Sequence, residues 1–414
     1  NIWPNAVFGS GKGRIRMRAA VTWAPHYLPP GIAGLGAKAS AAFLSRQKKR
    51  PAANGGPLQK QGDKELIFAL FPFTTALATA ASSYAQSADS LIDKLVQKGR
   101  IDNQSANRLK GLVTGTVDKS QYANCDFIIE AVFEEMSVKQ KLFSELEEFI
   151  SPECILATNT SSLSVENMSK HLKHPERVVG FHFFNPVALM PLLEVARTPH
   201  TTDEVTATAI AVGKELKKTM VITKDAPAFV VNRLLTMFWG EVTDAIDEGT
   251  PFEIGDKAVA PLGLPMTPFV LFGLVGPAVA LHVSETLHET LGPRFTISEN
   301  MKNYVSAGIK NFYIKTENGE YVPDPKVLAM MKQGNSPSSA EQVRVRALTA
   351  IAKEARMMLD EGVVSTPAEI DLCMMLGAGW PLHLGGILPY LDESGISESA
   401  TGSRFHPKGM ASLP

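Results

Sequence analysis

The sequence predicts an α/β domain built on a parallel sheet, followed by two related all-α domains. Between residues 126 and 183, short apolar segments alternate with helix-like segments, which is typical of parallel strands joined by helices. After Asp225 only helical patterns remain, and one stretch of that helical part recurs in degenerate form. The alternation predicts the sheet, and the recurrence predicts the pair of helical domains.

Apolar periodicity places the elements of the α/β part. The helix over 138–150 is amphipathic, with Leu142, Leu146 and Ile150 on one face. The first helix ends at Gly99, and Ser164 is positioned to cap the third. We expect strands at 126–132, 155–157 and 178–181, and helices at 90–98, at 138–150 and from Ser164 onward.

The recurring stretch consists of a long helix, a glycine-terminated turn, a second helix and an apolar Gly/Pro loop. Its first copy runs from Asn232 to Pro265 and its second from Arg346 to Pro381. The turns read Asp-Glu-Gly at 247–249 and at 360–362, and the polar residues 310–340 link the copies. We expect domains at 1–85 (an atypical basic start), 86–224 (α/β), 225–325 (first helical) and 340–414 (second helical).

Composition is that of a soluble globular protein. The chain has 414 residues, of which 44% are hydrophobic and 20% charged, and its net charge is −1. A charge so close to zero gives no overall attraction to nucleic acid or to an acidic membrane. The three cysteines, at positions 125, 154 and 373, lack metal-ligand spacing and suit a reducing compartment. We therefore expect no metal site and no nucleic-acid partner.

The first 62 residues differ from the rest, because they contain ten Lys or Arg and no Asp or Glu. A transit peptide and a basic arm for nucleic acid are two interpretations. A third, which we favour, is that the stretch is not native coding sequence, for example after a reading-frame error. The uncharged stretch 66–88 is interrupted by Pro72, so we expect a buried or partly buried helix there and no membrane span.

Three candidate catalytic side chains follow one another at the ends of apolar segments. They are Ser161 in the run Asn159–Leu163, His182 in Gly180–Pro186, and Glu194 in Met190–Val195. A carboxylate in an apolar stretch is costly unless it is paired, and an imidazole held by a carboxylate is a proton-transfer unit. The structural alternative is a buried histidine bonded to a backbone carbonyl, with Glu194 at the end of a strand.

Five runs, in register, resemble the 3-hydroxyacyl-CoA dehydrogenase family over residues 90–235. They are 126–134, 159–162, 182–186, Lys224–Pro227 and Phe229–Arg233. The resemblance implies a Rossmann-like domain that binds NAD. It implies His182 as general base, Glu194 as the residue that orients it, and Ser161 and Asn232 as hydrogen-bond partners of the reacting oxygen. The implied cofactor contacts are Ala131, Val132, Phe133, Glu134, Lys139, Ser161 and Asn185.

Two departures from the family concern glycines. Ala228 stands where the family has Gly, and its methyl group would crowd the turn if the turn needs positive φ. The clusters Gly9–Gly13 and Gly31–Gly36 do not match the Gly-x-Gly-x-x-Gly fingerprint, and the first acidic residue is Asp63. We therefore expect that residues 1–85 build no complete phosphate-binding strand–loop–helix unit, that the sheet lacks its first strands, and that NAD binding is weak.

The stretch Gly377–Pro381 and the second helical copy resemble the multifunctional enzymes of fatty-acid β-oxidation, of which this chain would be the C-terminal dehydrogenase portion. That resemblance implies oxidation of (3S)-3-hydroxyacyl-CoA, with a thiolase subunit or a second copy of the chain as partner. It implies the cytoplasm in a bacterium, and the mitochondrial matrix or peroxisome in a eukaryote. The alternative function is a catalytically inactive remnant that serves as a structural or partner-binding subunit.

Overall fold

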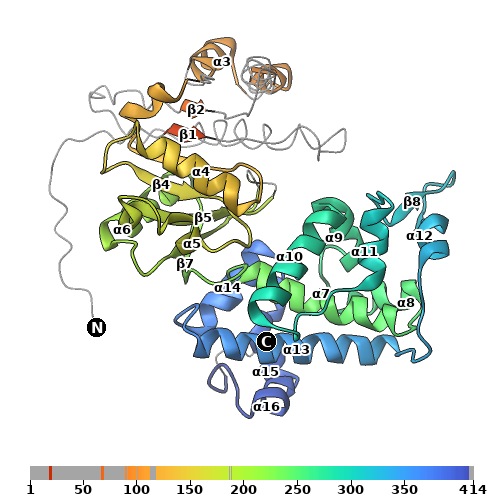
Figure 1. Cartoon of the computed structure of the whole chain (residues 1–414). Coiled ribbons are helices and arrows are strands. Elements are labelled where there is room, and N and C mark those ends of the chain that lie inside the picture. Colours follow the sequence, from red (N-terminus) through yellow and green to blue (C-terminus); the bar gives the residue numbers. More distant parts are fainter. Residues whose placement is uncertain are drawn as a thin grey trace, which may run out of the picture. The chain divides into compact units, whose positions relative to one another are not determined.

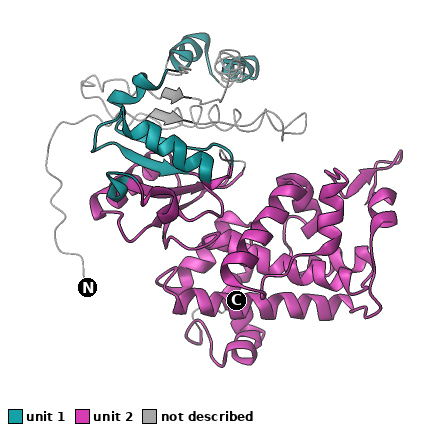
Figure 2. Cartoon of the chain, in the orientation of Figure 1, with its two compact units in different colours: residues 1–133, 137–158, 172–177 teal, residues 134–136, 159–171, 178–414 magenta. Residues whose placement is uncertain are grey.

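The computed structural model describes residues 89–90, 92–99, 101–111, 118–185, 187 and 189–409, together with two short strands at 18–20 and 67–69. The chain divides into two compact units (Figures 1 and 2). Unit 1 consists of residues 1–133, 137–158 and 172–177, and unit 2 of residues 134–136, 159–171 and 178–414. The two units are described separately below.

Unit 1 contains two pairs of parallel strands with helices between them. Strand β3 pairs with β4 from Phe127 opposite Ile155 to Glu130 opposite Thr158, and helix α4 joins them, as predicted. The elements are β1 (Arg18–Ala20), β2 (Ile67–Ala69), α3 (Asn103–Lys110), the 3-10 helix η1 (Lys119–Asn124), β3 (Phe127–Glu130), α4 (Met136–Glu147), β4 (Ile155–Thr158) and η2 (Pro175–Arg177). Residues 92–97 are helical, within the range expected from periodicity.

Strand β2 corrects one expectation. Strands β1 and β2 pair in parallel in a sheet of their own, separate from the sheet that contains β3, so the expectation that the latter sheet lacks its first strands is not overturned. Residues 67–69 form a strand where a helix was expected. A short apolar run bounded by Pro72 has no periodicity that would distinguish a strand from a helix. The two glycine clusters lie outside the described residues.

The α/β part of unit 2 contains β5 (Val178–Phe183), β6 (Leu192–Arg197) and β7 (Thr219–Lys224), with α5 (Val165–Ser169) before them and α6 (Asp203–Glu215) between β6 and β7. Strands β6 and β7 are parallel, as a helical crossover requires, whereas β5 and β6 are antiparallel. This departure from the predicted parallel arrangement arises because no helix separates β5 from β6. The two strands approach closely, since a Cβ at Gly180 would lie 2.7 Å from that of Ala196.

Helix α5 shows how local sequence sets an element. Ser164 caps it as predicted, because its hydroxyl accepts the Asn167 N–H at 3.1 Å. The carboxylate of Asp225, which lies just beyond β7, accepts the N–H groups of Val165 at 3.0 Å and Glu166 at 2.8 Å. These two caps satisfy the first amides of α5 and tie it to the start of the helical part.

The helical part of unit 2 begins after Asp225. Its elements are α7 (Val231–Asp247), α8 (Phe252–Lys257), η3 (Ala260–Leu262), α9 (Pro268–Val275), α10 (Pro277–Leu291), α11 (Glu299–Ser306), β8 (Tyr313–Lys315), β9 (Tyr321–Pro323), α12 (Pro325–Met330), α13 (Ala340–Asp360), α14 (Pro367–Gly377), η4 (Leu382–Leu384), α15 (Ile387–Glu393) and α16 (Ile396–Thr401).

The element order repeats where the sequence repeat was predicted. A long helix (α7 or α13), a turn with glycine at positive φ (Gly249 or Gly362), a short helix (α8 or α14) and a 3-10 helix follow in both copies. In each copy a buried aspartate of the short helix receives an N–H from the start of the next helix. Asp256 receives that of Phe269 at 2.9 Å, and Asp371 that of Leu388 at 2.8 Å.

The long helices of the two copies are joined by reciprocal ion pairs. Arg233 of α7 binds Glu354 through Nε at 2.6 Å and binds both carboxylate oxygens of Glu361, at 2.7 and 3.0 Å. At the matching positions, Arg346 of α13 binds Glu241 at 3.1 Å and both oxygens of Glu248, at 2.6 and 3.1 Å. Each copy thus offers the other the same set of charges, which is the pattern of an isologous interface.

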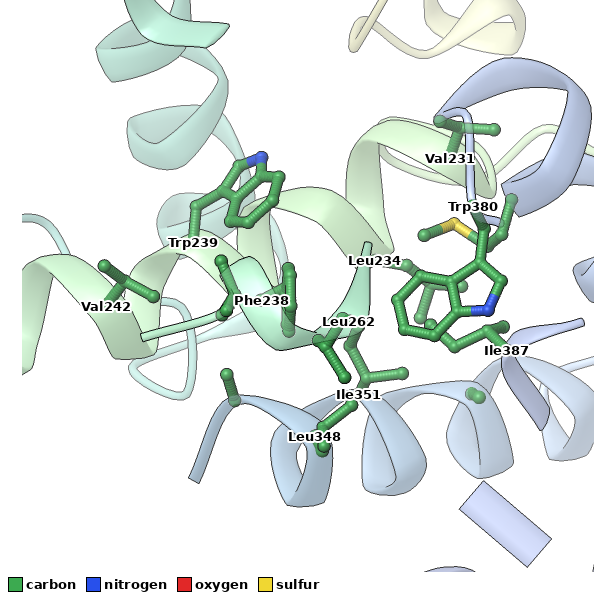
Figure 3. Packing of buried hydrophobic residues seen from close by; sticks show 14 of the residues in the cluster. Val231, Leu234, Phe238, Trp239, Val242, Leu262, Leu348, Ile351, Trp380 and Ile387 are labelled. Atoms are coloured by element: carbon green, nitrogen blue, oxygen red, sulfur yellow. The ribbon is translucent and has the colours of Figure 1, made fainter. Parts of the chain in front are cut away.

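A single hydrophobic core covers both copies. Figure 3 shows Leu348 and Ile351 of α13 directed towards Leu262 and α7, with Trp380 nearby. Leu234, Leu348 and Trp380 are at most 2% exposed. The two copies share this core. The predicted division of the helical part into domains at 225–325 and 340–414 therefore stays a prediction.

Among the described residues, no single helix is long and apolar enough to cross a membrane. Helices α9 and α10 together meet the same length and hydropathy criterion, but the chain bends by 102° between them.

Candidate active site

His182 and Glu194 face each other across the antiparallel pair β5–β6. They are register partners, so their side chains project from the same face of the sheet. His182 Nδ1 lies 2.7 Å from Glu194 Oε2, and the two residues are 3% and 0% exposed. His182 lies inside β5, one residue before its end. The partner of the imidazole is therefore a carboxylate, which favours the catalytic interpretation over the structural one.

Glu194 is held by the first turn of α7. Its Oε1 accepts the N–H groups of Val230 at 3.2 Å and Val231 at 3.0 Å. These amides at a helix N-terminus favour a negative charge. A carboxylate only accepts hydrogen bonds, so Nδ1 of His182 carries the proton and Nε2 is the nitrogen that can take up a proton.

Two aromatic rings lie against the His182 imidazole. The ring centroid of Phe184 is 4.5 Å away and that of Phe229 is 5.6 Å away, and both side chains are buried. These rings restrict the rotation of His182 and keep water from its faces.

The loop 159–163 is held in place by hydrogen bonds to the Glu134 carboxylate and by one to the side-chain amide of Asn159. Glu134 Oε1 accepts the Thr160 hydroxyl at 2.7 Å, the Ser161 N–H at 2.6 Å and the Ser162 N–H at 3.1 Å. Asn159 Oδ1 accepts the Phe183 N–H at 2.8 Å, which ties the loop to the strand of His182. The position of Ser161 is therefore fixed relative to β5.

The structure brings Asn232 and Ser161 together, and their role at the reacting oxygen stays a prediction. The side-chain amide of Asn232 donates to the backbone carbonyl of Ser161 at 3.3 Å. Asn232 is the second residue of α7, next to Val231, whose N–H binds Glu194. A continuous set of contacts thus links His182, Glu194, Asn232 and Ser161. Asn185 lies two residues beyond β5 and is exposed.

The remaining predicted cofactor residues lie in unit 1, where Ala131, Val132 and Phe133 directly follow β3 and Lys139 lies in α4. Ala131 and Val132 are half-buried and Phe133 is 53% exposed. Lys139 is 1% exposed, and its ammonium group lies 2.7 Å from Glu130 Oε1. Glu130 also accepts the Val132 N–H at 2.6 Å and the Thr158 hydroxyl at 2.6 Å.

These unit 1 residues fit a dinucleotide in part. An exposed aromatic ring after half-buried apolar residues, at the carboxyl end of a parallel strand, is suitable for contact with a planar ring. The Lys139 ammonium group forms an ion pair with Glu130, and this contact orders the segment that follows β3. The segment that would bind the pyrophosphate lies outside the described residues.

Sequence reasoning assigned no role to Glu130, Asn159 or Asp225. All three lie in the quoted motif runs. The partners of Asn159 and Asp225 are distant in sequence and therefore could not be read from spacing, whereas Glu130 binds the nearby Val132 and Lys139 as well as the distant Thr158. Asp225 caps α5, and burial raises the pKa of its carboxyl although the Glu166 and Val165 amides act to lower it. The cysteines are buried thiols, as expected, and burial raises the pKa of Cys154 to about 12.

Comparison with known proteins connects these features to one family. Residues 73–226 match the model for the NAD-binding domain of 3-hydroxyacyl-CoA dehydrogenase, and residues 229–319 match the model for the C-terminal domain. The first match contains Glu134, Ser161, His182 and Glu194, and the second contains Asn232.

Two curated relatives are similar over most of this chain. The glyoxysomal fatty acid β-oxidation multifunctional protein MFP-a of Cucumis sativus is 29% identical over 88% of this chain and 52% of its own length. The fatty acid oxidation complex subunit alpha of Idiomarina loihiensis is 33% identical over 74% of this chain and 44% of its own length. This chain therefore spans about half the length of these relatives.

Solved structures agree on the fold. (S)-3-Hydroxybutyryl-CoA dehydrogenase PaaH1 from Ralstonia eutropha is 25% identical, with a TM-score of 0.57 over 71% of this chain and 94% of that chain. The 3-hydroxybutyryl-CoA dehydrogenase of Escherichia coli K12 covers 96% of this chain and 97% of its own, with a TM-score of 0.68 at 21% identity. With its Rossmann-like NAD-binding domain and the helical domain after it, the chain belongs to the 3-hydroxyacyl-CoA dehydrogenase family.

Proposed function

We propose that this protein oxidises a (3S)-3-hydroxyacyl-CoA to the 3-oxoacyl-CoA with NAD. The observation that carries the proposal is the buried pair His182–Glu194, joined at 2.7 Å within the matched NAD-binding domain. A histidine whose Nδ1–H is held by a carboxylate presents Nε2 as a base.

The reaction removes a proton from the 3-hydroxyl group and a hydride from the same carbon. NAD supplies the hydride acceptor when it is bound. His182 Nε2 takes the hydroxyl proton as the hydride leaves, because a free alkoxide is too basic to form near neutral pH. Glu194, held by the α7 amides, stabilises the imidazolium that results.

The other family positions have supporting roles in this proposal. Ser161 and Asn232 hydrogen-bond the reacting oxygen and position it for transfer. Asn185 would contact the nicotinamide when NAD is bound. By the family resemblance, Ala131, Val132, Phe133, Glu134, Lys139 and Ser161 would each contact NAD when it is bound. The contacts of Glu134 with the 160–162 backbone support its place, because they fix the loop that carries Ser161.

The physiological setting is inferred from the family resemblance together with the names of the relatives. Fatty-acid β-oxidation is the proposed pathway, with acyl-CoA as substrate and a thiolase subunit or a second copy of the chain as partner. The proposed compartments are the bacterial cytoplasm, or the peroxisome or mitochondrial matrix of a eukaryote. The alternative of a catalytically inactive remnant gains no support from the described site, where His182 is hydrogen-bonded to Glu194 and Asn232 to Ser161.

A direct assay tests the proposal. The purified chain is given NAD at millimolar concentration and a short-chain (3S)-3-hydroxyacyl-CoA, and NADH formation is followed by absorbance. We expect turnover with the 3S and not with the 3R enantiomer. A chain that binds NADH and acyl-CoA but forms no NADH would instead be the inactive remnant.

A further inference from the structure

The turn that precedes α7 has two successive residues in the left-handed backbone region. Ala228 has φ 58° and Phe229 has φ 50°, and neither is a glycine. Side chains beyond Cα make this region unfavourable for L-residues. Such backbone persists only where the surrounding structure holds it, and it is concentrated at functional sites.

This turn sets the direction in which α7 begins. The N-cap residue Val230 makes no side-chain cap hydrogen bond. The first amides of the helix instead point at Glu194 Oε1, with Val230 N at 3.2 Å and Val231 N at 3.0 Å. With Oε1 engaged in this way, Oε2 is the oxygen that binds His182 Nδ1.

Both side chains of the turn are fully buried, which explains how the strained backbone is held. The Phe229 ring lies 5.6 Å from the His182 ring. The Ala228 side chain belongs to a small apolar cluster on α7, α10 and the residues after α10, which consists of Ala228, Met237, Val283, Leu287 and Phe295. The turn is therefore packed against the proposed base on one side and against two helices on the other.

We propose that Ala228 and Phe229 are positioning residues for His182. They hold the α7 amides on Glu194 Oε1, so that Oε2 stays directed at His182 Nδ1, and the Phe229 ring limits rotation of the imidazole. The inference rests on the proposed function in taking His182 as the base, although the hydrogen bond itself does not depend on activity.

The substitution Ala228→Val tests the backbone conformation, because a β-branched residue is poorly tolerated at positive φ. We expect kcat to fall by about 10- to 100-fold with little change in KM for NAD or acyl-CoA, since the base is misplaced while binding is retained. Ala228→Gly, which keeps the same φ without strain, should be at least about tenfold more active than Ala228→Val.

Lys217→Val is the matched control. Lys217 also has positive φ, 59°, but lies exposed in the connection between α6 and β7. This variant should carry the same backbone strain and keep the kcat of the original chain. If Ala228→Val fails to fold, Phe229→Leu removes the ring while keeping apolar bulk, and a fall in kcat without a change in KM is again expected.

Proton NMR gives a second measurement that needs no turnover. The Nδ1–H of His182, bonded to a carboxylate, should give a low-field resonance in the original chain and in Lys217→Val, and this resonance should be lost or shifted upfield in Ala228→Val and Phe229→Leu. If the original chain shows the resonance but no turnover, the proposed function is contradicted and the positioning role is not. An unchanged resonance or an unchanged kcat in folded Ala228→Val and Phe229→Leu would overturn the positioning role.

Discussion

At the residue scale, the site depends on which nitrogen of His182 is engaged. Glu194 takes Nδ1, and the α7 amides take the other Glu194 oxygen, so the pair is held from two elements at once. This arrangement leaves little freedom for either side chain in a region that is almost fully buried.

We expect His182→Gln to lower kcat by about 100- to 10,000-fold, the usual effect of losing a general base. Gln fits the space and can still donate to Glu194, so the melting temperature should change little. His200→Gln is the control, because His200 is half exposed and its nearest carboxylate oxygen, on Glu166, is 3.9 Å away. Turnover by His182→Gln at the rate of the control would remove His182 from the mechanism.

The sequence predicted part of this site. The contact between His182 and Glu194 was predictable, because a carboxylate in the apolar run Leu192–Val195 needs a partner. The hydrogen bonds from the Val230 and Val231 amides to Glu194 were not predictable. Valine carries no capping signal, and these amides are more than 30 residues away from Glu194 in the sequence. The positive φ of Ala228 confirms the concern raised by the missing glycine.

At the scale of elements, α7 and α13 are joined by the reciprocal ion pairs of Arg233 and Arg346. The two arginines occupy matching positions but different environments. The side chains of Arg233 and Glu354 are 0% exposed, whereas those of Arg346 and Glu248 are 33% and 43% exposed. Burial makes an ion pair costly to break, and solvent screening makes an exposed pair weak.

We therefore expect Arg233→Met to lower the free energy of unfolding by about 3 kcal/mol, because among the described residues Arg294 is then the one remaining partner of the buried Glu354. The matched variant Arg346→Met should cost less than about 1 kcal/mol. Urea denaturation of both variants checks this difference. Equal losses would mean that burial does not set the strength of these pairs.

Another prediction concerns Asp244 on α7. Burial, above all, raises the pKa of this carboxyl to about 6, with smaller contributions from Glu241 and Asp247. The unfolded chain thus loses this proton at lower pH than the folded chain, and the contribution of Asp244 to stability falls as pH rises from about 4 to 6.

Asp244→Asn should remove this fall and raise stability at pH 7 by about 1 to 2 kcal/mol. Asp360→Asn, at the exposed end of α13, is the control. Thermal melts across this pH range measure the effect. A variant with the pH dependence of the original chain would show that Asp244 is not responsible.

The elements themselves were predictable to different degrees. Alternation predicted β3, α4 and β4, and the two Asp-Glu-Gly turns predicted the helical repeat. The antiparallel pairing of β5 with β6 was missed, because an apolar strand carries no mark of its direction. The reciprocal ion pairs were also missed, since a repeat in sequence does not say which charges of one copy face the other.

At the scale of the whole molecule, the two family matches leave parts of the chain uncovered at both ends. The C-terminal match begins at residue 229, two residues before α7, and the helical part continues beyond residue 319 into a second copy that shares its core. The NAD-binding match begins only at residue 73, after β1 and β2. Residues 1–72 therefore lie outside both family matches.

The last prediction concerns the strength of NADH binding. Dinucleotide sites of this fold use the carboxyl ends of the strands, with an acidic residue for the ribose and a glycine-rich turn for the pyrophosphate. Here β2 ends at Ala69 and the next acidic residue is Asp89, while Asp63 and Glu65 precede β2. Neither glycine cluster has the fingerprint spacing, and Pro29 and Pro30 supply no amide donors.

We therefore expect the adenosine and pyrophosphate half of NADH to add little to binding. Titrating the chain with NADH and with reduced nicotinamide mononucleotide, and following nicotinamide fluorescence, separates the two halves of the cofactor. The two dissociation constants should agree within about tenfold, since few hydrogen bonds would distinguish the ligands. NADH binding more than about a hundredfold tighter than the mononucleotide would require two or more strong contacts to the missing half. That result would show that residues 1–85 form a working phosphate site by a sequence that departs from the fingerprint.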